Sequence, residues 1–188
     1  EYGTAKANLR SGLLPPLSGS FRNAYKDSCG AFIRSEIWAC VAPGCPQIAA
    51  SMACQDAILD HGNGEGTYGE LFCAALESAA FVEGDVLRLI DIALTYIPGE
   101  CGVARAVRSV IASHEAGRTA LEARDALLTG FRGGAFFGRA DAVSARDLEK
   151  GFFDGPRGWD APSNIGIVVL GLLYGEGDFG NTVCTAVN

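Results

Sequence analysis

The stretch that decides the fold is residues 68–82, Tyr-Gly-Glu-Leu-Phe-Cys-Ala-Ala-Leu-Glu-Ser-Ala-Ala-Phe-Val. Its apolar residues recur every three or four positions and form one wide stripe of Leu71, Phe72, Ala75, Leu76, Ala79 and Ala80. This is the spacing of an amphipathic helix that buries one face. We therefore predict a helix over residues 68–82, preceded by a glycine-rich loop, Gly62-Asn-Gly-Glu-Gly66.

The helical period continues on both sides of this stretch. Further helices are expected over residues 28–41, 46–60, 86–97, 101–115, 119–129 and 163–174. Asp27 or Ser28 should cap the first of these, Asp85 should cap the third, and Ser163 the last, whose apolar run favours a helix over a strand. Residues 119–122 have the pattern of a capping box, and residues 144–147 resemble a weaker start of this kind. Residues 130–139 are rich in glycine and phenylalanine and predict a long loop. The fold class is all-α.

Length and composition bound the classes of function. The chain has 188 residues, which predicts one domain, and 48% hydrophobic with 20% charged residues is a globular balance. A net charge of −7 without clustered lysine or arginine excludes a protein built mainly around nucleic acid or anionic membranes. The longest apolar run, residues 165–174, is about half of what a bilayer span needs.

The cysteines bear on the cellular compartment, and the chain ends bear on whether the sequence is complete. Seven cysteines occur without a C-x-x-C pair and with only two histidines, which argues against a zinc site. We expect reduced thiols and a cytoplasmic protein. Because the sequence starts at Glu1 and its only methionine is Met52, we expect a chain that is truncated at both ends.

Three motif matches are weak. The pattern G-x-G-x-x-G occurs at residues 64–69 and 175–180, but neither match has the strand and the distant acid that a dinucleotide site requires. His114-Glu115 is half of a zinc-protease motif without its second histidine, and we interpret it as a solvated helix end.

Two segments with small residues could bind an anion. Residues 27–31, Asp-Ser-Cys-Gly-Ala, and residues 62–68 each precede a predicted helix, whose first N–H groups favour an anion. His61 lies between them in the sequence. From the residues alone a second interpretation stays open, a flexible loop with a histidine stabilised by a helix dipole. Asp56 and Asp60, at i and i+4, predict a solvated helix face, although these two acids, Glu65 and Glu70 could assist at the site.

Five segments in order resemble the ADP-ribosylglycohydrolase family, and together they touch most of the chain from about residue 18 to residue 188. They are residues 30–39 (GAFIRSEIWA), 42–46 (APGCP), 55–61 (QDAILDH), 64–81 (GEGTYGELFCAALESAAF) and 164–179 (NIGIVVLGLLYGEGDF). The resemblance implies an all-α, multi-helix orthogonal bundle. It also implies hydrolysis of the glycosidic bond between ADP-ribose and an acceptor, which would be a protein or a small molecule.

The resemblance also implies a site. The loop Cys29-Gly30-Ala31 matches the family segment that contacts the ribose and phosphate of ADP-ribose, and His61 matches the histidine beside the substrate. We assign Asn63, Gly64 and Tyr68 of the adjoining loop to the same substrate site, and we expect Gly64→Val to weaken ADP-ribose binding while sparing the fold.

The family uses two Mg²⁺ (or Mn²⁺) ions. Their ligand motifs, and the acid that acts on the substrate, are expected outside the 188 residues. The chain by itself should therefore bind Mg²⁺ too weakly for catalysis. The alternative is a non-catalytic nucleotide-binding or scaffold module that has lost the metal site.

Overall fold

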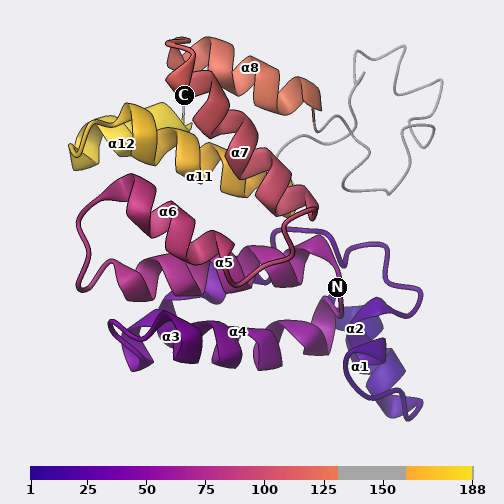
Figure 1. The fold of residues 1–188 in the computed structure, drawn as a ribbon. Helices are drawn as coiled ribbons and strands as arrows, with labels where there is room; N and C mark the ends of the chain where they lie inside the picture. Colours follow the sequence, from indigo (N-terminus) through magenta and orange to yellow (C-terminus); the bar gives the residue numbers. More distant parts are fainter. Residues whose placement is uncertain (131–159, 188) are drawn as a thin grey trace, which may run out of the picture. The chain divides into compact units, whose positions relative to one another are not determined.

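The computed structural model describes residues 1–130 and 160–187, and these residues form helices joined by turns, with no strand among them (Figure 1). The chain divides into two compact units, residues 1–101 and residues 102–188. The all-α prediction is confirmed.

The first unit is built around the helix pair α4 and α5. Its elements are α1 (Tyr2–Arg10), α2 (Leu17–Ser20), the 3₁₀ turn η1 (Phe32–Arg34), α3 (Glu36–Val41), α4 (Pro46–Asp60), α5 (Glu65–Ala79) and α6 (Val86–Leu94). Alanines form the α3–α4–α5 contact, with Ala42, Ala49, Ala53 and Ala74 all buried. Small side chains let the helix backbones approach closely. The larger aliphatic residues of α4 are less buried than its period suggests, and Ile48 and Leu59 are exposed.

The predicted helix over residues 28–41 is wrong in its first half. Residues 29–31 form a turn, η1 follows, and the α-helix starts only at Glu36. The predicted caps are used elsewhere, because the Asp27 carboxylate accepts from the N–H of Glu65 (2.8 Å). Ile33, Ile37 and Val41 of the predicted apolar stripe are exposed, and only Trp38 of that stripe packs against the buried alanine cluster.

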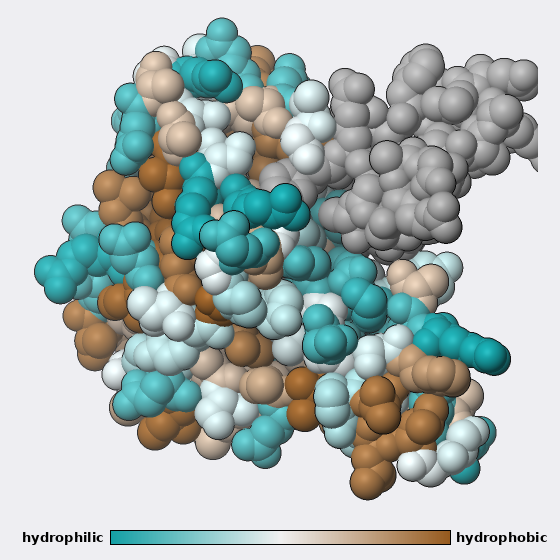
Figure 2. Space-filling view, turned by 45° about the vertical axis from the view of Figure 1, so that its right-hand side comes forward, coloured by the Kyte–Doolittle hydropathy of each residue, from teal (hydrophilic) through white to brown (hydrophobic). Residues whose placement is uncertain are grey.

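Other boundaries differ less. α5 begins at Glu65 rather than Tyr68, with Gly64 as the N-cap in an extended conformation. Asp85 caps α6 as predicted, since its side chain accepts from the N–H of Arg88. The helices α1 and α2 were not predicted. Leu14 and Leu17, where these two helices meet, are 71% and 55% exposed. Figure 2 shows that hydrophobic residues, in brown, are scattered over the visible face among hydrophilic ones.

The second unit contains α7 (Gly102–Glu115), α8 (Ala120–Gly130), α11 (Ala161–Tyr174) and α12 (Phe179–Val187). The capping box is confirmed, because the Thr119 N–H donates to Glu122 (2.8 Å) and the Glu122 N–H donates to the Thr119 hydroxyl (3.3 Å). Asp160, not Ser163, caps α11. The predicted loop at residues 130–139 begins one residue late, because Gly130 still belongs to α8; its other residues and the helix start at 144–147 lie outside the described residues.

Two observations concern the environment of the chain. The seven cysteines, all within the described ranges, form no disulfide with one another. Among the described helices, none is both long enough and apolar enough to cross a membrane.

Candidate functional site

The two segments singled out in the sequence lie against each other. The Asp27 carboxylate accepts from the Glu65 N–H at 2.8 Å, and the Gly66 N–H donates to the Lys26 carbonyl at 3.2 Å. Residues 26–28 are therefore fixed to the first turn of α5. These contacts bring the residues just before the small-residue loop, Cys29-Gly30-Ala31, against the glycine-rich loop.

The glycines of the loop serve this internal contact. A Cβ atom at Gly64 would collide with the Lys26 carbonyl and lie 2.8 Å from Asp27 Oδ1. At Gly66 it would collide with the His61 ring. The expectation that Gly64→Val leaves folding intact is therefore wrong, because there is no room for a side chain there.

The N–H groups in the first turn of α5 are already hydrogen-bonded within the protein. The N–H groups of Glu65, Gly66 and Thr67 all donate to protein acceptors, the last to the Gly64 carbonyl at 3.1 Å. The idea that this helix start binds a phosphate through those groups is wrong. The N–H groups of Gly30 and Ala31, in contrast, donate no hydrogen bond to another described residue. These two N–H groups therefore have no described protein acceptor, and both residues are buried.

His61 is completely enclosed and links two segments. Its Nδ1 lies 2.5 Å from Asp60 Oδ1, and its Nε2 lies 3.3 Å from the Ser28 hydroxyl. Burial opposes ionisation of Asp60, but hydrogen bonds from His61 and Arg34 outweigh it, so the pKa of Asp60 lies below its ordinary value. An ionised Asp60 fixes the orientation of the imidazole ring. The histidine in turn positions Ser28, the residue immediately before the small-residue loop.

Arg34 is the residue that sequence reasoning missed. Its guanidinium donates to the Asp56 carboxylate and to both oxygens of Asp60 (3.0 and 3.1 Å), and it lies 3.8 Å from Glu70 Oε2. It also donates to the Gly30 carbonyl at 3.1 Å. The predicted solvated face of Asp56 and Asp60 is therefore wrong, since an arginine pairs with both acids and ties them to the small-residue loop.

Burial divides the predicted site residues into two groups. Gly30, Ala31, His61 and Gly64 are buried, whereas Cys29 and Tyr68 are partly exposed and Asn63 is exposed. Only the side chains of the second group are accessible to a ligand. The first group shapes the loops beneath them.

The described residues do not fit a divalent metal ion. In residues 1–130 and 160–187, no group of three or more histidine, cysteine, aspartate or glutamate side chains could hold one. The acidic cluster next to the candidate site consists of Asp56, Asp60 and Glu70. These acids surround the Arg34 guanidinium, which occupies the place that a metal ion would need.

Comparison with known families gives a match over almost the whole chain. A model of the ADP-ribosylglycohydrolase family matches residues 2–188. The chain belongs to the ADP-ribosylglycohydrolase family. The match includes α1 and α2, which lie before the segments that carried the resemblance. Neither the curated proteins nor the solved structures gave a match.

Proposed function

We propose that this ADP-ribosylglycohydrolase family member hydrolyses the glycosidic bond between ADP-ribose and an acceptor, which is a protein or a small molecule. The observation that carries the proposal is the family match over residues 2–188. The contact of residues 26–27 with residues 65–66 supports it, because the residues assigned to the substrate are next to these two segments in the chain.

The chemistry of ADP-ribose suits the groups available there. Its diphosphate needs N–H donors, and the N–H groups of Gly30 and Ala31 have no protein acceptor among the described residues. Its riboses and adenine need polar and aromatic side chains, which Asn63 and Tyr68 offer at the accessible edge. We assign His61 a positioning role, because its ring is enclosed and acts through Ser28.

The proposal includes two Mg²⁺ (or Mn²⁺) ions, held by residues other than these 188. Such ions, when bound, orient the substrate and activate a water molecule. The residues of this chain would bind ADP-ribose and hold the two loops in place, and no step of the reaction is assigned to Asp56, Asp60 or Glu70.

The test measures ADP-ribose binding by calorimetry, and release of ADP-ribose from ADP-ribosyl-arginine and ADP-ribosyl-serine peptides by mass spectrometry, with Mg²⁺ and with EDTA. Asn63→Ala and Tyr68→Ala should each weaken binding about tenfold, equivalent to about 1.4 kcal/mol. Asn181→Ala, an exposed asparagine on α12, serves as the control and should leave binding unchanged. Because the metal ligands are proposed to lie outside these 188 residues, release is measured with the full-length protein. Binding without release by that protein would favour the non-catalytic module, and absence of binding would refute both functions.

A further inference from the structure

α5 carries an acid that the proposed function does not use. The Glu70 side chain is completely buried, between α5 and the segment made of η1 and α3. Its Oε1 accepts from the Trp38 indole N–H at 2.9 Å. Its Oε2 is also buried and accepts no hydrogen bond from any described residue. A buried carboxylate oxygen without a donor is costly, so this atom requires an explanation.

The charges around Glu70 do not balance if every acid is ionised. Three carboxyl groups, those of Asp56, Asp60 and Glu70, surround the single guanidinium of Arg34. The two aspartates take its hydrogen bonds, and Glu70 Oε2 stays 3.8 Å away. Asp56 and Glu70 both approach the same guanidinium, Asp56 at Nε and Glu70 Oε2 at 3.8 Å from an Nη atom. Two carboxyl groups that face each other can form a hydrogen bond only when one of them keeps its proton.

We propose that Glu70 keeps a proton at neutral pH and donates it to the Asp56 carboxylate, so that the contact between α5 and the η1–α3 segment depends on this proton. The protonated acid satisfies Oε2 as a donor while Oε1 still accepts from Trp38. This inference goes beyond the proposed function and does not rest on it.

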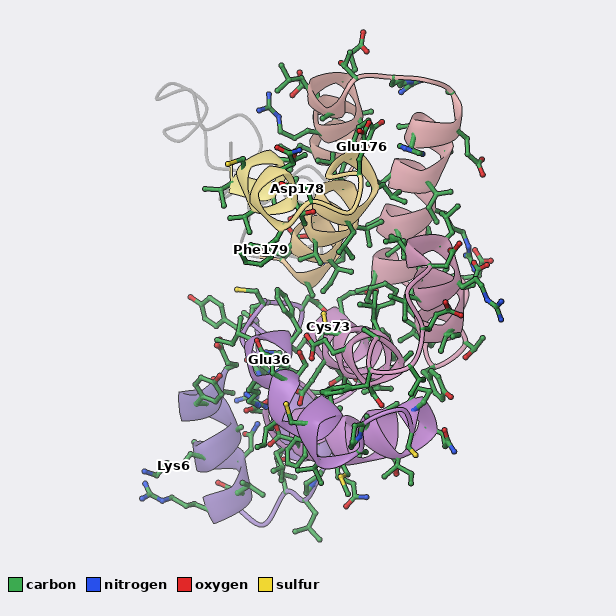
Figure 3. All side chains as sticks on the ribbon, turned by 90° about the vertical axis from the view of Figure 1, so that its left-hand side faces the viewer. Lys6, Glu36, Cys73, Glu176, Asp178 and Phe179 are labelled. Atoms are coloured by element: carbon green, nitrogen blue, oxygen red, sulfur yellow. The ribbon has the colours of Figure 1, made fainter. Side chains whose placement is uncertain are left out.

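The surroundings of Glu70 favour the protonated form. Burial raises the pKa of Glu70 to about 8; Arg34 opposes this rise, and Asp56 adds to it. Two more titratable side chains lie next to this cluster, His61 beside Asp60 and Tyr2 beside Arg34. The helices packed against α5 add the exposed Glu36 of α3 and the exposed Arg88 and Asp91 of α6, and α5 itself carries Cys73 and Glu77. Figure 3 shows Glu36 and Cys73 on the neighbouring helices α3 and α5.

Loss of this proton would reach the small-residue loop. An ionised Glu70 repels Asp56 and competes for Arg34, and Arg34 also donates to the Gly30 carbonyl. The η1–α3 segment continues directly from Ala31. The contact should therefore loosen as the pH rises above about 8, and the loop Cys29-Gly30-Ala31 with it.

The experiment follows the Trp38 indole N–H by ¹H–¹⁵N NMR between pH 6 and 9.5, with Trp38→Phe to assign the signal. In the wild-type chain the signal should shift with a midpoint near pH 8, and Glu70→Gln should abolish the step. Glu77→Gln is the matched control: Glu77 lies two turns further along α5 and accepts from the Ser35 hydroxyl, so the step should remain.

A second measurement needs no variant. With ¹³C-labelled glutamate, one side-chain carboxyl signal of the folded wild-type chain should titrate near pH 8. A Trp38 signal that does not move in this range, a step that persists in Glu70→Gln, or glutamate carboxyl signals that all titrate below pH 7.5 would each overturn the proposal.

Discussion

Replacing Arg34 by methionine should lower the free energy of unfolding by about 3 kcal/mol. Methionine retains much of the apolar stem but removes every N–H group of the guanidinium. Asp56 and Asp60 then lose their cation, and the Gly30 carbonyl loses a donor. Breaking a buried ion pair from one side costs about 3–5 kcal/mol. We take the lower end, because the Arg34 side chain is 27% exposed and water can partly replace its bonds.

The assay is urea unfolding followed by tryptophan fluorescence and circular dichroism. Arg88→Met is the matched control, since Arg88 also pairs with one acid, Glu83, at 3.2 Å, but is 74% exposed. Exposed pairs contribute about 0–1 kcal/mol, so the control should unfold almost like the wild-type chain. Equal losses in the two variants would refute the conclusion that Arg34 organises the acids of α4.

Three further predictions concern packing, capping and pH. Gly66→Ala should lower the free energy of unfolding by about 1–3 kcal/mol, because the new methyl group would collide with His61. Gly3→Ala is the control: nothing lies within 4 Å of its new methyl group, so it should be neutral or slightly stabilising, and thermal melting compares the two variants. Asp85→Ala should cost about 1 kcal/mol by removing the N-cap of α6, and an unchanged urea midpoint would contradict this. The pKa of Glu70 is raised from 4.5 to about 8, so its contribution to the free energy of unfolding is complete below pH 4.5 and is lost as the pH rises to 8. In urea titrations at several pH values, Glu70→Gln should remove up to about 5 kcal/mol of this pH dependence. An unchanged pH dependence in the variant would contradict the raised pKa.

The sequence alone was sufficient for the features that depend on neighbouring residues. The helical period predicts α4, α5, α7, α8 and most of α11, because a helix needs only residues three and four positions apart to share a face. The capping box at residues 119–122 and the Asp85 cap are equally local. The family could also be identified from short segments in order, and the match over residues 2–188 confirms it.

The structure adds the surroundings of the predicted site residues, not their role. The structure supports the neighbourhood of residues 26–31 and 61–66, but whether Cys29, His61, Asn63 and Tyr68 contact ADP-ribose stays a prediction. What the structure adds is burial, which separates accessible side chains such as Asn63 from enclosed ones such as His61. Periodicity cannot make this distinction, because a loop residue has no face.

Only the tertiary structure decided the polar network. Arg34 meets Asp60 across 26 positions, Trp38 meets Glu70 across 32, and Asp27 meets Glu65 across 38. No sequence period links residues so far apart, so Asp56 and Asp60 looked like a solvated face and Asp27 like the cap of its own helix. The docking of η1 and α3 onto α4 and α5 brings one guanidinium among three acids, and the cost of burying unpaired charge then determines which groups pair and which one keeps a proton.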